Sequence, residues 1–182
     1  MINTPTSSAP HWPFLTFLLI HENEHQRPTN TGQFWHQCVP QSSMAIWQRK
    51  QIPLNLAQYL KRPDLQPVVV YPTEQALSET QWFSTQRDPN LTPLYILLDG
   101  TWQEAKKIHN RSTWLAHLPR LSLSDLPSSD FRLRRNQQEG HLCTFEVGME
   151  LAVKHGIDTT ALKQSFDRYQ HDYLTRNMNG SA

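Results

Sequence analysis

The stretch LYILLDGTWQE (residues 94–104) decides the fold class of this chain. Its apolar half predicts a buried strand, and Asp99-Gly100 ends that strand. Thr101 and Glu104 have the spacing of a capping box, which predicts a helix that runs to about residue 111. Gly100 permits a sharp turn. A carboxylate at the end of such a strand lies where open α/β sheets bind ligands, so Asp99 is a candidate functional residue.

The rest of the chain alternates between apolar β-branched runs and helical patterns. We expect a polar loop over residues 21–32. We expect strands or extended segments near residues 14–20, 44–48, 68–71, 120–123 and 131–133, and helices near residues 33–39, 54–60, 74–83, 145–155 and 160–174. This order predicts an α/β fold, in one domain, with a mostly parallel sheet.

Composition limits the function classes. The chain has 182 residues, a formal net charge of +1, 37% hydrophobic residues and 18% charged residues. Near-neutral charge with 10% aromatic residues argues against full disorder, and it excludes a uniformly basic coat for nucleic acid. We expect one folded domain over residues 14–176, with flexible segments at 1–13 and 177–182.

The apolar runs and the cysteines of the sequence predict the cellular location and the metal content. The apolar run at 14–20 is too short for a membrane span, and the residues before it do not resemble a signal peptide. The two cysteines, Cys38 and Cys143, form no C-x-x-C pair. We therefore expect a cytoplasmic protein without a membrane anchor, a metal or an obligate protein partner.

The segment HENEH (residues 21–25) matches the zinc-protease pattern H-E-x-x-H. That pattern binds metal only on a helix, where both imidazoles reach one ion. Here it follows a predicted strand and precedes Pro28, so we interpret it as a polar loop.

Positive charge is concentrated between Trp102 and His141. That segment holds seven Lys and Arg residues against four Asp and Glu residues, a net +3, beside several aromatic residues. Such a patch is typical of phosphate contacts combined with base stacking, although a solvated surface has the same composition. Trp102 is the candidate for stacking on a base or nucleoside.

Five ordered blocks together resemble the DTW-domain family, which includes tRNA-uridine aminocarboxypropyltransferases. The naming motif appears as Asp99-Gly100-Thr101-Trp102. The other blocks are His21-x-x-Glu24-x-x-Arg27 with Thr29-Asn30-Thr31-Gly32, Tyr71-Pro72-x-Glu74, Phe131-Arg132-Leu133-Arg134, and Leu142-Cys143-Thr144-Phe145-Glu146-Val147. Many members carry an N-terminal cysteine cluster, and this sequence has none.

The resemblance implies a fold, a donor and a reaction. The fold would be SPOUT-like, related to SPOUT RNA methyltransferases, and it allows a C-terminal knot. The donor would be S-adenosylmethionine, and the partner would be tRNA. The 3-amino-3-carboxypropyl group would move to N3 of a uridine, with 5′-methylthioadenosine as the by-product.

The resemblance also assigns roles to residues. Asp99 would be the general base that removes the uridine N3 proton. The donor-binding set is Pro72, Gly100, Thr101, Thr144 and Glu146, and the set for the RNA substrate is Arg27, Asn30, Trp102 and Arg134. Two alternatives stay open: a SAM-dependent RNA methyltransferase of SPOUT type, and a non-catalytic RNA-binding module.

Overall fold

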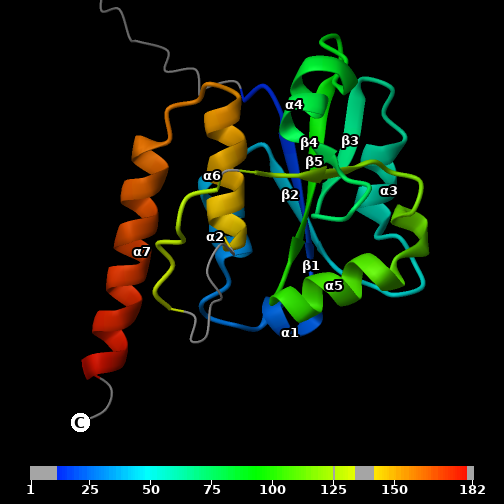
Figure 1. Cartoon of the computed structure of the whole chain (residues 1–182). Coiled ribbons are helices and arrows are strands. Elements are labelled where there is room, and N and C mark those ends of the chain that lie inside the picture. The colour runs from blue at the N-terminus through cyan, green and yellow to red at the C-terminus, as the bar shows by residue number, and fades with distance from the viewer. Residues whose placement is uncertain (1–11, 125, 134–141, 180–182) are drawn as a thin grey trace, which may run out of the picture.

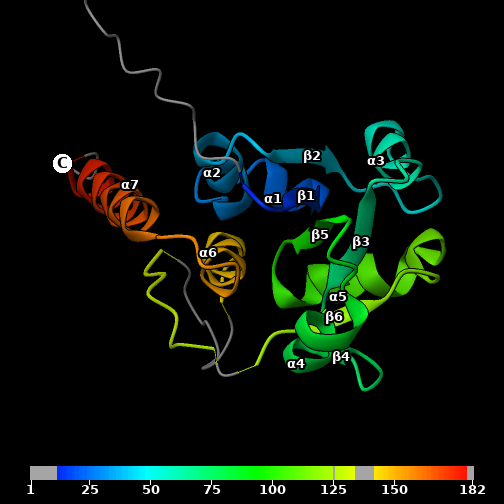
Figure 2. The same ribbon diagram turned by 90° about the horizontal axis from the view of Figure 1, so that it is seen from above.

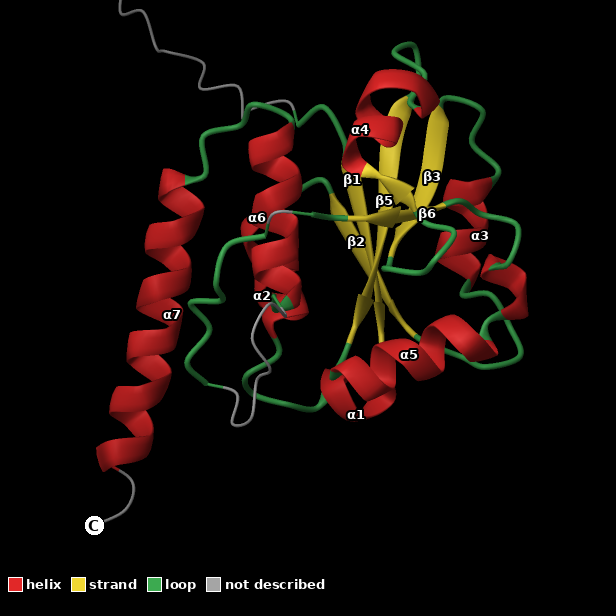
Figure 3. Cartoon of the chain, viewed as in Figure 1, coloured by secondary structure: helices red, strands yellow, loops and turns green. Residues whose placement is uncertain are grey.

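The computed structural model describes residues 12–124, 126–133 and 142–179. Within them, six strands form one sheet in which every pair is parallel, in the order β2-β1-β5-β3-β6-β4 (Figure 3). The strands are β1 (Leu15–Ile20), β2 (Ser42–Ile46), β3 (Leu65–Val70), β4 (Leu77–Ser78), β5 (Thr92–Asp99) and β6 (Arg120–Ser122). The predicted α/β fold with a mostly parallel sheet is confirmed.

Helices cover both faces of this sheet (Figures 1 and 2). They are α1 (Glu22–His25), α2 (Thr31–Cys38), α3 (Leu54–Leu60), α4 (Glu79–Gln81), α5 (Trp102–Arg111), α6 (Thr144–Lys154) and α7 (Thr160–Asn179), with a π-helical turn at Trp82–Gln86 and a 3-10 turn at Thr113–Leu115. Figure 2 shows α2 and α6 on one face, with α7 outside them, and α3 and α5 on the other.

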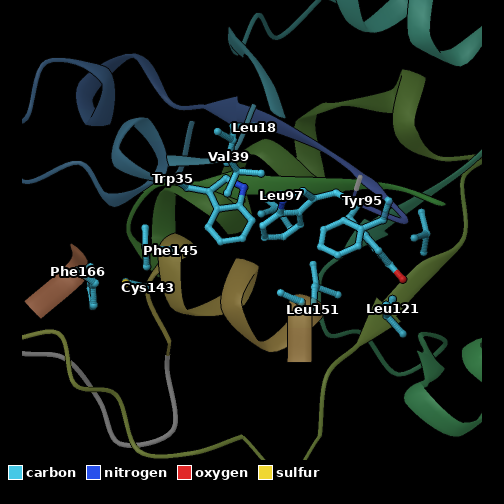
Figure 4. Close-up of a cluster of buried hydrophobic side chains, with 14 of the residues drawn as sticks. Leu18, Trp35, Val39, Tyr95, Leu97, Leu121, Cys143, Phe145, Leu151 and Phe166 are labelled. Atoms are coloured by element: carbon cyan, nitrogen blue, oxygen red, sulfur yellow. The ribbon is translucent and has the colours of Figure 1, made fainter. Parts of the chain in front are cut away.

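Burial of both faces explains why β1 and β5 are continuous apolar runs instead of alternating ones. On the α2 and α6 side, Tyr95 and Leu97 pack with Trp35, Phe145 and Leu151 (Figure 4). The alternate residues of β5, such as Ile96, pack against the α3 and α5 side. Two apolar layers therefore hold β5 in the middle of the molecule.

Described residues extend past both limits of the expected domain 14–176. Trp12, within the segment 1–13, is buried and contacts the Trp35 ring edge-on at 5.8 Å between centroids. At the other end, α7 continues to Asn179.

No helix in the described part of the chain is long and apolar enough to cross a membrane.

Three local predictions differ from the structure in whole or in part. The expected helix at residues 74–83 begins only at Glu79, because Leu77 and Ser78 pair with β6 and Ser78 forms the capping box with Gln81. The expected loop at 21–32 contains α1 and the start of α2, whose N-cap is Asn30. Residues 131–133 form no strand; Phe131 instead packs on Phe166 at 5.9 Å.

The SPOUT-like knot stays a prediction. Residues 125 and 134–141, on the connection from β6 to α6, lie outside the described residues.

Candidate functional site at the carboxyl edge of the sheet

Asp99 ends β5 and is only 1% exposed. Asn30 Nδ2 donates to its Oδ2 at 2.7 Å, and Thr144 Oγ1 donates to its Oδ1 at 2.5 Å. Gly32 lies directly against the same carboxylate, since a Cβ built on Gly32 would be 2.6 Å from Asp99 Cγ. Three segments that are distant in the sequence therefore meet at one carboxyl group.

Two of those segments are helix starts. Asn30 is the N-cap of α2, where its Oδ1 accepts from Gln33 N at 2.6 Å, and Thr144 is the first residue of α6. The amino end of a helix carries partial positive charge, which favours an anionic group nearby. Both helix starts therefore stabilise a negative charge at Asp99, and the two side-chain donors fix its orientation.

The turn after Asp99 has the predicted conformation. Thr101 N and Oγ1 donate to Glu104 Oε2 at 2.8 and 2.9 Å, and Glu104 N donates to Thr101 Oγ1 at 3.3 Å. The capping box is thus confirmed. Gly100 is required by packing within this turn, because a Cβ there would lie 2.8 Å from Glu104 Cβ.

Arg27 connects α1 to this turn. Its guanidinium lies 2.6 Å from Glu24 Oε2 and 3.5 Å from Glu104 Oε1. Burial alone would raise the pKa of Glu104, but hydrogen bonds from Thr101 and the charge of Arg27 outweigh it and hold that pKa below its ordinary value. Asn30 Nδ2 also donates to the Glu24 carbonyl oxygen at 3.2 Å, so α1 is joined to the Asp99 contacts as well.

The two histidines of the H-E-x-x-H segment have different surroundings. His21 is buried and is the N-cap of α1; its Nδ1 accepts from Asn23 N at 3.3 Å, and its Nε2 lies 3.2 Å from Lys107 Nζ. His25 ends the four-residue helix α1. Within the described ranges, no group of three or more His, Cys, Asp or Glu residues is placed to hold a metal ion.

Trp102 is 45% exposed and belongs to a stack of rings. It lies on Tyr71 at 5.4 Å between centroids, with 17° between planes, and Tyr71 lies on His109 at 4.5 Å and 18°. Pro72 is exposed and follows Tyr71 directly, so it is next to this stack. The stack was not predicted from the sequence, because Tyr71 lies after β3 and no local signal pairs it with Trp102 and His109 of α5.

Glu146 is buried in the first turn of α6. Its carboxylate accepts from Ser129 Oγ at 2.8 Å, from Asp130 N at 2.6 Å and from Cys143 N at 2.8 Å. These bonds tie the segment at 129–130 to the start of the helix that carries Thr144. No sequence signal pairs Ser129 with Glu146, because their spacing matches no regular element.

The candidate residues thus fall into groups. Around Asp99 the structure gathers Asn30, Thr144, Gly100 and Thr101, with Arg27 one contact further out. Trp102 and Pro72 lie at the Tyr71 stack, and Glu146 supports α6. Arg134 lies outside the described residues.

Comparison with known proteins places the chain in a family. No solved structure is a significant match. A sequence model of the DTW domain matches residues 5–174, nearly the whole chain. That range includes every strand and the start of each helix described above. The chain therefore belongs to the DTW domain family.

Proposed function

We propose that this protein transfers the 3-amino-3-carboxypropyl group of S-adenosylmethionine to N3 of a uridine in tRNA, releasing 5′-methylthioadenosine. Membership in the DTW domain family suggests a tRNA-modifying enzyme. The observation that carries the proposal is the position of Asp99, a buried carboxylate at the end of the central strand, held between two helix starts. We also propose that the protein acts in the cytoplasm.

The charge at Asp99 fits the donor. S-adenosylmethionine supplies an electrophilic carbon bonded to a cationic sulfur. Asn30 and Thr144 donate to Asp99 as neutral groups, so they orient its carboxylate without cancelling its charge. A carboxylate held in this way favours a nearby cation.

We assign Gly100, Thr101 and Thr144 to donor binding because they surround Asp99. Pro72 is assigned to it from the loop that follows β3, and Glu146 is assigned to it because its hydrogen bonds hold the start of α6.

The proposed reaction needs one base and no acid. Asp99 accepts the N3 proton of the uridine. The nitrogen lone pair forms the bond to carbon while the carbon–sulfur electron pair leaves with sulfur, which becomes a neutral thioether. No residue needs to protonate that leaving group, so catalysis depends on the proton transfer and on alignment of the three atoms.

The proposed RNA contacts rest on exposure for Trp102 and Arg27, and on its position at Asp99 for the buried Asn30. Trp102 offers an exposed ring held by Tyr71, which suits stacking on a base. Asn30 lies at Asp99, and Arg27 positions α1 against Glu104. Arg134 remains a proposed phosphate contact from the sequence.

The test uses S-adenosylmethionine labelled in the aminocarboxypropyl group, with tRNA from a strain that lacks the protein. Labelled tRNA and methylthioadenosine are expected. S-adenosylhomocysteine as the product would instead indicate a methyltransferase, and tRNA binding without donor consumption would indicate a binding module.

Asp99→Asn should lower the rate by ~10²–10⁴-fold, whereas the exposed matched control Asp167→Asn should not. Near-full activity of a folded Asp99→Asn protein would contradict the assigned role. Circular dichroism of both variants supplies the folding control.

A further inference from the structure

Two adjoining cavities follow α2 away from Asp99. The first, of about 290 Å³, is lined by Arg27, Asn30 and Gln33 among others. The second, of about 640 Å³, is lined by residues of α7 that include Arg168 and Arg176. Pro28, Phe34 and Tyr169 line both. We call the joined hollow the α2–α7 groove; it begins at the side chain that bonds Asp99 and ends on the carboxyl half of α7.

The middle of the groove is aromatic. The rings of Phe34 and Tyr169 are stacked at 4.2 Å between centroids with 16° between planes, and Tyr169 donates its hydroxyl to the Pro28 carbonyl at 3.1 Å. Phe34 also stacks on Phe145 in the core at 5.2 Å. These contacts hold the aromatic surface rigid, so a ligand ring placed on it costs little ordering.

The α7 side of the groove is basic. Arg168 and Arg176 make no hydrogen bond or ion pair with any residue that the structure describes. They are two turns apart, about 12 Å along the helix at a rise of ~1.5 Å per residue. Asp172 lies between them on the same face and reduces the net positive charge of that stripe.

A polar group is also buried at the other end. His25 lines the first cavity, and its Nδ1 is buried without a hydrogen-bond partner among the described residues. A buried imidazole nitrogen without a partner is costly, and a shift of this ring toward the cavity would let a ligand group bond it.

We propose that the α2–α7 groove docks a single-stranded segment of the RNA substrate next to the target uridine, with bases on the aromatic middle and phosphates on Arg168 and Arg176. The identity of the RNA rests on the proposed function. Rigid aromatic surfaces bordered by arginine are the usual means of holding unpaired nucleotides. The groove is continuous with Asn30, so the strand that enters at α7 leads to Asp99.

Direct binding of unmodified tRNA, measured by fluorescence anisotropy without donor at several salt concentrations, tests this surface. The double variant Arg168→Ala/Arg176→Ala should raise Kd about 10-fold. It should also reduce the slope of log K against log salt by about 1.4, at ~0.7 for each lost phosphate contact to a single strand. Asp172→Asn should lower Kd by about 3-fold, because it removes a repelling charge.

The matched control is Lys61→Ala/Arg62→Ala at the end of α3, on the opposite face of the sheet (Figure 2). It removes the same charge and should leave tRNA affinity close to that of the unmodified protein. A groove variant with unchanged Kd and salt slope would overturn the proposal. A second result would also overturn it: a protein that sediments as a dimer without RNA, and as a monomer when the groove variant is used. The groove would then hold a second copy of the chain.

Different results contradict the proposed docking surface and the proposed reaction. Weaker binding in the groove variant without any transfer by the unmodified protein supports the groove and contradicts the proposed reaction. Transfer that proceeds with an unchanged KM for tRNA in the groove variant supports the reaction and contradicts the groove. If the groove and the reaction are both correct, the groove variant has a higher KM for tRNA and an unchanged KM for the donor.

Discussion

Replacement of Gly32 by alanine tests whether the position of Asp99 is set by close packing. The new Cβ would lie 2.6 Å from Asp99 Cγ and Oδ2 and 2.8 Å from Oδ1. A terminal carboxylate usually turns aside at low cost. Here both oxygens are held, by Asn30 and Thr144, so relief of the clash must break a buried hydrogen bond or shift the start of α2.

The magnitude follows from two opposing contributions. Overpacking in a well-filled interior costs ~1–3 kcal/mol. Alanine in a helix regains up to ~1 kcal/mol over glycine, and less at the second position of α2 than in mid-helix. The net loss is about 1–2 kcal/mol, and the melting temperature should fall by roughly 3–6 °C for a chain of this size. If Asp99 is the base, its displacement should also lower kcat by about 100-fold.

Gly156→Ala is the control. Gly156 has φ of 73° and no atom within 4 Å of a built Cβ, so alanine there adds backbone strain without touching the residues around Asp99. Thermal melting and labelled-donor transfer well below the melting temperature should show loss of stability in both variants, but loss of activity only in Gly32→Ala. A Gly32→Ala protein with unchanged melting temperature would refute the packing argument. Equal activity of the two variants would refute the link to catalysis.

Two further predictions concern stability. Thr144→Val removes the hydroxyl that donates to Asp99 Oδ1, and it should lower the free energy of unfolding by ~1–3 kcal/mol. Thr144→Ser keeps a hydroxyl and should cost less. Urea denaturation compares the two variants, and equal midpoints would contradict the role of this bond. Burial lowers the pKa of His155 to about 4 from 6.5, so the folded chain binds fewer protons than the unfolded chain between those values. The free energy of unfolding should therefore fall by about 1–2 kcal/mol as the pH drops from 6.5 to 4, a figure that is reduced for solvent screening. A His155→Gln variant with the same pH dependence would show that another group is responsible.

The central strand and its turn were predictable because their signals are local. An unbroken apolar run identifies β5, and the capping box needs only four consecutive residues. The helix expected at 74–83 failed for the opposite reason. Residues 77–78 pair with β6, more than forty residues later, and tertiary pairing outweighs local helical preference.

The same distinction applies to the candidate site. The sequence places Asp99 at the end of a strand, but nothing local shows that Asn30 and Thr144 hold its two oxygens. Gly32 has no positive φ to mark it, and its need for glycine appears only when β5 is packed against α2. The Trp102–Tyr71–His109 stack was missed because Tyr71, which lies after β3, joins two rings of α5 that nothing local pairs with it.

The burial of Asp99 limits how the proposed reaction can begin. At 1% exposure it cannot touch a uridine while Asn30 and Thr144 hold it, so one bond must be exchanged. Exchange of the Thr144 hydroxyl for the N3–H of a uridine keeps one donor on the oxygen, and it therefore avoids the ~1–3 kcal/mol cost of an unmet buried acceptor. Glu104 offers no such exchange, because one oxygen caps α5 and the other faces Arg27. Of these two carboxylates, Asp99 is therefore the one with a neutral hydroxyl donor, that of Thr144, which a substrate can displace, and a base at this edge requires such a donor.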